Sequence, residues 1–256
     1  MITNLQIKNV SPFVEGATFG DVGAYDRIDG VATGTLDPSH PRNRGIALLD
    51  KAPRNAAGLV EYRSDFVLLR PADAAKGNGR LLYEVNNRGR IMLFANLCAG
   101  AAGNQPQTAE DLGNALPLHL GFSLLWTGWD PGAPKTTGLS LDVPVIGGII
   151  QPIREEFVSG TRLGVHEAFK LTYEAVGPVT VTVRRTQTSP RVPIVAETLD
   201  SRTVRPVEPI ETGSIYEVRY VATKPRVLGI GFAATRDVIS ALRRDGSGDH
   251  REPRHL

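Results

Sequence analysis

Hydrophobic positions along this chain follow one pattern in its first half and another in its second. Short apolar runs at 46–49, 66–69, 81–85 and 122–126 are separated by glycine- and proline-containing turns, and each is short enough for a β-strand. The segment 16–34 alternates turn residues with single apolar positions, which indicates an opening β-meander. The first half is therefore expected to be built around a sheet.

One helix is expected between the last two of these strands. Thr108 to Asp111 has the spacing of a capping box, with Asp in place of Glu or Gln, and Pro117 or Gly121 would end the helix. The order strand, loop, helix, strand is that of a right-handed βαβ unit in a parallel sheet. This order favours an α/β fold over an all-β fold.

Two-residue alternation is the dominant pattern between about 131 and 224. It is clearest at 179–183 and 216–220, and shorter strands are expected at 169–173 and 192–196. Such alternation is typical of an antiparallel, half-exposed sheet. We interpret this stretch as a β-rich antiparallel insertion.

A second helix is expected near the end of the chain. Ala234, Val238, Ala241 and Leu242 fall on one helical face, followed by two arginines and Gly246. The polar stretch after this helix shows no hydrophobic periodicity and is interpreted as a disordered tail. The expected segments are 1–134 for the meander and first sheet, 135–224 for the insertion, 225–244 for the helix and 245–256 for the tail.

Composition narrows the functional classes. The chain has 256 residues, 41% of them hydrophobic, and a formal net charge of +2. Because no Lys/Arg run is interleaved with aromatics, we expect no nucleic-acid partner, and no apolar segment approaches the roughly twenty residues of a membrane span. The N-terminus does not resemble a signal peptide. The single cysteine, Cys98, fits a reducing compartment and a buried hydrophobic role, so a cytoplasmic location is expected.

No serine has the flanking residues of a catalytic nucleophile. The G-x-S-x-G elbow needs glycine two positions on either side, and none of the eleven serines satisfies this requirement. Ser123 and Ser140 have glycine on one side only and are interpreted as exposed or hydrogen-bonded strand serines.

Histidine spacing does not indicate a metal site. His166-Glu167 lacks a second histidine four residues further on, and His40 and His119 are assigned to loops. No metal is expected at any of the five histidines, His40, His119, His166, His250 and His255.

Two glycine-containing motifs each allow two interpretations. Gly229 to Ala234 matches the dinucleotide pattern G-x-G-x-x-A, but no second strand ending in an acidic residue follows, so helix packing is favoured and no cofactor is expected. The loop of Asn86, Asn87, Arg88 and Gly89 follows a strand, where backbone N–H groups could stabilise an oxyanion. An ordinary tight turn with a solvated arginine is the other interpretation.

Five blocks of sequence together resemble a known family. They are 14–25, 52–56, 77–89, 121–129 and 234–243. In combination they are similar to the bacterial alpha/beta hydrolase domain-containing proteins, a branch of the α/β-hydrolase superfamily. The resemblance extends to about Arg244.

The resemblance implies a serine hydrolase of esters or related acyl compounds, without a metal, in which the Asn86–Gly89 loop takes the oxyanion-hole position. It makes 1–134 the first half of a partial α/β-hydrolase-type sheet and 225–244 the helix before the nucleophile elbow. Ser247 has aspartates where the elbow glycines would stand. We therefore expect the N-terminal part of an esterase-like protein that lacks nucleophile, acid and histidine as written, with an ester-like small-molecule substrate in the complete protein. The alternative is a non-catalytic β-rich binding or interaction module.

Overall fold

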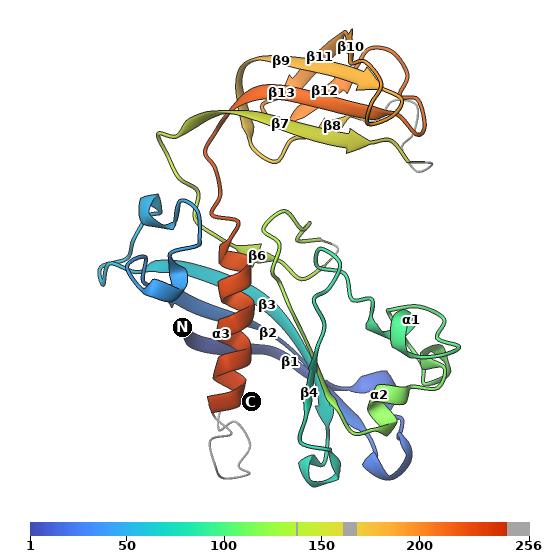
Figure 1. Cartoon of the computed structure of the whole chain (residues 1–256). Helices are drawn as coiled ribbons and strands as arrows, with labels where there is room; N and C mark the ends of the chain where they lie inside the picture. The colour runs from blue at the N-terminus through green and yellow to red at the C-terminus, as the bar shows by residue number, and fades with distance from the viewer. Residues whose placement is uncertain (137, 161–167, 245–256) are drawn as a thin grey trace. The chain divides into compact units, whose positions relative to one another are not determined.

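The computed structural model describes residues 1–136, 138–160 and 168–244 (Figure 1). The chain forms two compact units, and each is described by itself. Unit 1 comprises Met1–Pro144 with Val227–Leu256, and unit 2 comprises Val145–Arg226. The sequence analysis placed the corresponding boundaries after residues 134 and 224.

Unit 1 contains one sheet with the strand order β1-β2-β3-β5-β4, and β6 pairs with β3. Neighbouring strands are antiparallel except β4 and β5, which are parallel. The strands are β1 (Ile2–Pro12), β2 (Tyr25–Leu36), β3 (Val60–Pro71), β4 (Leu81–Tyr83), β5 (Ser123–Thr127) and β6 (Leu141–Asp142).

The expectation of an α/β fold with a partial α/β-hydrolase-type sheet is wrong. The described structure is mostly β-sheet, and its sheets are predominantly antiparallel. The sequence order indicated one parallel pair, and β4 and β5 do form it. The error was to extend parallel pairing to the rest of the sheet.

The two faces of this sheet pack against different elements, because successive side chains of a strand point to opposite faces. On one face Ile28, Phe66 and Leu68 pack with Val238 of α3 (Ile230–Arg244), and Figure 1 shows α3 crossing in front of β1, β2 and β3. The larger core on the other face contains Tyr25, Val67, Leu69, Leu124, Trp126, Phe94, Leu112 and Leu118.

Glycines on β2 face aromatic rings on β3. Gly30 pairs with Phe66 and Gly34 pairs with Tyr62. A methyl group at Gly30 would lie 2.5 Å from Phe66 Cζ, and one at Gly34 would lie 2.4 Å from the Tyr62 ring. The absence of a side chain at these glycines therefore lets the rings lie flat across the neighbouring strand.

The connections of unit 1 are short helices and turns rather than long covering helices. The helix expected from Thr108 is divided, because Gly113 has a φ of +57° and a methyl group there would lie 2.2 Å from the Ala99 carbonyl oxygen. The strand expected at 46–49 is also wrong, since Leu48 has a positive φ and a 3₁₀ helix follows. The short connecting helices of unit 1 are η1 (Phe13–Gly16), η2 (Gly20–Val22), η3 (Pro41–Asn43), η4 (Leu49–Lys51), η5 (Ala74–Lys76), α1 (Leu93–Leu97), η6 (Glu110–Leu112) and α2 (Leu116–His119).

Unit 2 consists of two antiparallel sheets around an apolar core. The sheets have the orders β10-β9-β13-β7 and β11-β12-β8. Val181, Val204, Tyr216 and Val218 are among the buried residues of the core. The alternating segments 179–183 and 216–220 lie in β9 and β13, which pair antiparallel as the alternation predicts. The strands are β7 (Ile150–Val158), β8 (Phe169–Lys170), β9 (Glu174–Arg184), β10 (Val192–Ile194), β11 (Ala196–Asp200), β12 (Thr203–Pro206) and β13 (Ile215–Thr223).

Among the residues that the structure describes, none of the helices has the length and apolar character needed to span a membrane. The predicted tail at 245–256 lies outside the described residues, as do His166, Ser247, His250 and His255.

Candidate functional site

The loop after β4 is held as a turn by its own hydrogen bonds. Backbone N–H groups of Asn87 and Arg90 each donate to the other residue's carbonyl oxygen, and Arg88 N–H donates to the Asn86 carbonyl. The Gly89 N–H donates to Asn86 Oδ1 over 2.7 Å. The N–H groups of residues 87–90 thus serve the turn, and an oxyanion bound to any of them would have to replace one of these bonds.

Asn86 fixes this loop to the sheet. Its side chain is buried, and its Nδ2 donates to the carbonyl oxygen of Thr127 at the end of β5 over 2.7 Å. Trp129 Nε1 donates to the Asn86 carbonyl oxygen over 2.8 Å. The side chain of Asn86 therefore has a structural role, which the tight-turn interpretation requires.

A cleft lies beside this loop, on the sheet face opposite α3. Its volume is about 780 Å³. Apolar side chains from β3, β5 and the start of α1 contribute to its lining, and the segment 89–92 and residues 102–107 contribute polar groups. Its lining includes Arg27, Val67, Leu69, Arg90, Phe94 and Trp126.

Glu84 organises the apolar side of this cleft. Its carboxylate accepts hydrogen bonds from the backbone N–H groups of Met92 and Leu93, each at 3.1 Å in the closer contact, and from Trp126 Nε1. These bonds tie the start of α1 to β5. Phe94 and Trp126 consequently lie with ring centroids 5.9 Å apart.

The charged groups of the cleft differ in their pairing. Arg27 and Asp29 stand two residues apart on one face of β2 and form two hydrogen bonds, of 2.9 and 2.8 Å. This pairing raises the pKa of Arg27. Arg90 is exposed, and within residues 1–136, 138–160 and 168–244 its guanidinium group has no partner. Arg90 is thus available to an anionic group in the cleft.

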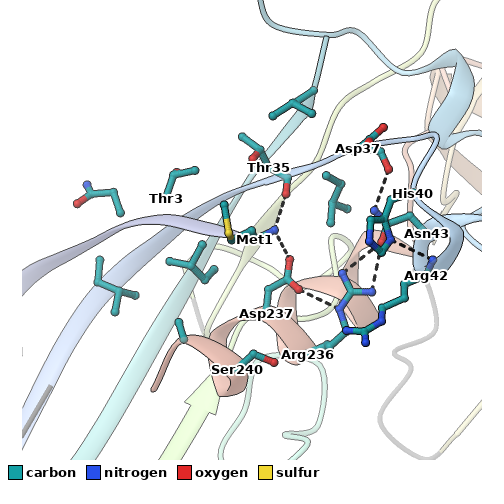
Figure 2. Close-up of a pocket in the computed structure, with 16 residues that line it drawn as sticks. Met1, Thr3, Thr35, Asp37, His40, Arg42, Asn43, Arg236, Asp237 and Ser240 are labelled. Atoms are coloured by element: carbon teal, nitrogen blue, oxygen red, sulfur yellow. Dashed lines mark hydrogen bonds and ion pairs between the residues drawn. The ribbon is translucent and has the colours of Figure 1, made fainter. Parts of the chain in front are cut away.

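A second pocket of about 950 Å³ lies between α3, β1 and the segment 37–43 (Figure 2). Arg236 Nε donates to Asp237 Oδ1 over 2.9 Å, and both terminal nitrogens of Arg236 donate to Asn43 Oδ1 over 3.2 Å. Asp237 Oδ2 also accepts from Tyr62 and from the amine of Met1. These bonds join α3 to the sheet, so we interpret this pocket as a structural junction.

The remaining candidate residues also have structural partners. Ser140 Oγ donates to Asp65 Oδ2 over 2.6 Å, and Ser123 begins β5. His40 Nδ1 accepts from the Arg42 N–H, whereas His119 ends α2, not a loop, and lies edge-on to Phe19. No group of three or more metal-binding side chains occurs among the described residues.

Cys98 and the Gly229–Ala234 motif both belong to packing. Cys98 is buried in the larger core of unit 1, as predicted, and burial raises the pKa of its thiol. A methyl group at Gly231 would lie 2.0 Å from the Trp129 carbonyl oxygen. This contact is the helix-packing role that the sequence analysis favoured for the motif.

Comparison of this chain with protein-family models, with curated proteins and with solved structures gives no match.

Gly89 of the predicted loop lines the cleft, but the other lining residues were not expected as site residues from the sequence. The spacing of Arg27 and Asp29 could have indicated that they pair, because two charged residues at i and i+2 in a strand lie on the same face of the sheet. Arg90 directly follows the loop that was singled out. No local signal placed either group beside Phe94 or Trp126, because this arrangement depends on packing between distant segments.

Proposed function

We propose that unit 1 binds a small acyl compound, a carboxylic acid or its ester, in the cleft beside the Asn86–Gly89 loop. The observation that carries this proposal is the combination, in one cleft, of an apolar wall and the unpaired guanidinium group of Arg90. The proposal corresponds to the binding-module alternative from the sequence analysis.

The apolar wall suits the hydrocarbon part of such a ligand. Val67, Leu69, Phe94 and Trp126 come from three different elements and form the floor of the same space, where each side chain is at most 4% exposed. A volume of about 780 Å³ is within the range of small-molecule sites, which are mostly apolar with a few oriented polar groups. Burying an alkyl chain here contributes roughly 0.8 kcal/mol for each methylene removed from water.

Arg90 suits the carboxylate part. A guanidinium group can donate two parallel hydrogen bonds to one carboxylate, and such charge-assisted bonds are stronger than neutral ones. Arg27 has its charge compensated by Asp29, so it supplies further N–H donors without adding net charge. Asp111, the other carboxylate of the lining, accepts from the backbone N–H groups of Gln107 and Thr108. The Arg90 guanidinium is therefore the group that favours an acid over its ester.

Two further observations bear on the choice between binding and hydrolysis. The family resemblance supports the acyl class of ligand. The N–H groups of residues 87–90, the Ser140 hydroxyl and the His40 imidazole are engaged in structural hydrogen bonds, which supports binding. Serine-dependent hydrolysis stays a prediction of the resemblance, and labelling of one serine by a fluorophosphonate probe would favour it.

The test is isothermal titration calorimetry of the full chain with octanoate, ethyl octanoate and acetate. We expect one octanoate per chain, weaker binding of the ester and no measurable binding of acetate, which lacks the apolar part. Equal heats for acetate and octanoate, or no heat with any of the three, would refute the proposed site.

A further inference from the structure

Three arginines surround one buried carboxylate on the four-stranded sheet of unit 2. Glu217 is 1% exposed, and its two carboxylate oxygens accept hydrogen bonds from Arg219 Nε over 2.7 Å and Arg191 Nε over 2.8 Å. Arg154 approaches the same carboxylate at 3.8 Å. Burial alone would raise the pKa of Glu217, but the bonds from the two arginines outweigh it and lower that pKa. Glu217 is therefore held as an anion.

The strand register concentrates like charges at this place. Arg154 on β7 lies directly opposite Arg219 on β13, and Glu156 lies opposite Glu217. Like charges directly opposite each other destabilise a sheet. Glu156 is neutralised separately by the buried Arg184. Arg154, Arg191 and Arg219, hereafter the arginine cluster, thus share one carboxylate and have two positive charges in excess.

The arginine cluster also has unused donors. The side chains of Arg154, Arg191 and Arg219 are 53%, 41% and 59% exposed, so their outer ends reach solvent. Each contacts Glu217 through one nitrogen, and the other guanidinium nitrogens have no partner within the described part of the chain. Several N–H groups are therefore free to bind a second anion.

We propose that the arginine cluster binds a phosphate monoester. A monoester phosphate has a charge between about −1.5 and −2 at neutral pH, which matches the excess of two positive charges. Its three terminal oxygens can each accept from a guanidinium fork, the geometry for which arginine is preferred over lysine. The site is on unit 2 and is independent of the acyl cleft on unit 1.

The experiment titrates the full chain, at low ionic strength, with free O-phosphoserine, a phosphoserine heptapeptide and the same peptide without phosphate. Low salt is needed because exposed charges are screened at higher ionic strength. We expect both phosphorylated probes to bind and the unphosphorylated peptide not to bind. Tighter binding of the peptide would assign the phosphate to a protein partner, and equal binding would assign it to a small molecule. Absence of binding by both phosphorylated probes would overturn the proposal.

Charge-matched variants separate this site from general attraction. Arg191→Gln and Arg219→Gln should each weaken binding of the phosphorylated probes about tenfold, since hydrogen bonds to charged groups have this order of effect. Arg205→Gln is the matched control, because Arg205 is 45% exposed and pairs with Glu197 elsewhere in unit 2. If the Arg205 variant lost the same affinity for the phosphorylated probes, the net charge of the chain alone would explain the effect, and the proposal would be overturned.

Glu217→Gln should have the opposite effect on the affinity for the phosphorylated probes. Glu217 competes with the ligand for the same guanidinium groups, so its neutralisation should tighten phosphate binding several-fold, whereas Glu197→Gln should leave it unchanged. Circular dichroism establishes that the Glu217 variant is folded. If that variant does not fold, the comparison between the Arg191 and Arg205 variants decides whether the arginine cluster binds the phosphate.

Discussion

The Tyr62 hydroxyl donates a hydrogen bond of 3.1 Å to Asp237 Oδ2, which joins β3 to α3 across 175 positions of sequence. Both side chains are buried. Burial and the neighbouring carboxylate raise the pKa of Tyr62, so the hydroxyl stays protonated and donates throughout the physiological range. This bond is a direct polar link between the sheet and the helix, as is the contact between the Tyr83 and Thr235 hydroxyls.

Tyr62→Phe should lower the free energy of unfolding by about 1.5–3 kcal/mol, the range for a bond to a charged acceptor. Tyr83→Phe is the control, because within the described part of the chain the Tyr83 hydroxyl bonds only to the neutral hydroxyls of Thr127 and Thr235. For that variant we expect about 1 kcal/mol. Urea denaturation measures both, and equal losses would show that the charge of Asp237 has no part in the effect.

Asp237 should also make stability depend on pH. Burial alone would raise its pKa, but hydrogen bonds from Arg236 and the Met1 amine outweigh burial and lower it. A carboxylate with a lowered folded-state pKa stabilises the fold above its unfolded pKa of about 3.9, and this contribution is lost as pH falls below that value.

The measurement is the difference in unfolding free energy between the unmodified chain and Asp237→Asn. We expect a constant difference from pH 7 to about pH 5 and a smaller one at pH 3, while the other carboxylates cancel because both proteins contain them. A difference that does not change down to pH 3 would contradict the assignment.

Gly30→Ala should destabilise unit 1 by about 1–3 kcal/mol, because the new methyl group would lie 2.5 Å from Phe66 Cζ and 2.6 Å from the Gln6 carbonyl oxygen. Gly45→Ala is the matched control, since nothing lies within 4 Å of a methyl group there. Thermal denaturation followed by circular dichroism compares them. A Gly30 variant as stable as the Gly45 variant would mean that both the Phe66 ring and the Gln6 backbone shift without cost to make room for the methyl group.

Gly231→Ala tests the packing role of the Gly229–Ala234 motif. Alanine normally favours a helix over glycine by about 1 kcal/mol, yet here its methyl group would lie 2.0 Å from the backbone oxygen of Trp129. We expect a net loss of stability of about 1–3 kcal/mol. Gly229→Ala should cost less, because its nearest neighbour is a side-chain atom of Ile46 at 3.2 Å, which can shift. Chemical denaturation of both variants measures this order, and the reverse order would contradict the packing role.

Local patterns in the sequence were sufficient for several strands but not for the fold class. The alternation at 216–220 reports which side chains are buried, and that periodicity is a local property of β13. The orientation of a strand relative to its neighbours depends on connections and distant partners, so a single parallel pair was a poor guide to the whole sheet. The Tyr62–Asp237 bond and the Phe94–Trp126 contact are likewise non-local.

For the candidate sites, too, local properties could be predicted from the sequence, whereas properties that depend on three-dimensional contacts could not. Cys98 was predicted to be buried because a lone cysteine with no histidine close to it in the sequence usually behaves as a small buried hydrophobic residue, and it is buried. The loop at Asn86 was correctly recognised as a turn-forming segment, but its chemistry depends on where each N–H points. Hydrogen bonds inside the loop determine that direction, and spacing in the sequence does not report it.

Arg90→Gln should weaken octanoate binding in the acyl cleft about tenfold, because it removes the charge-assisted bonds to the carboxylate and leaves a shorter, uncharged polar side chain. Binding of ethyl octanoate should change less than twofold, since the ester has no negative charge. Arg80→Gln is the control, because Arg80 is also exposed in unit 1 and is not among the residues lining the cleft.

The comparison of acid and ester makes this prediction specific to the assigned role of Arg90. If the substitution altered the shape of the cleft, the affinity for both ligands would fall together, because both use the wall formed by Leu69, Phe94 and Trp126. If Arg90 acted only through the net charge of the chain, the Arg80 variant would lose the same affinity for octanoate. A loss confined to the acid and to the Arg90 variant is therefore the result that identifies Arg90 as the carboxylate-binding group.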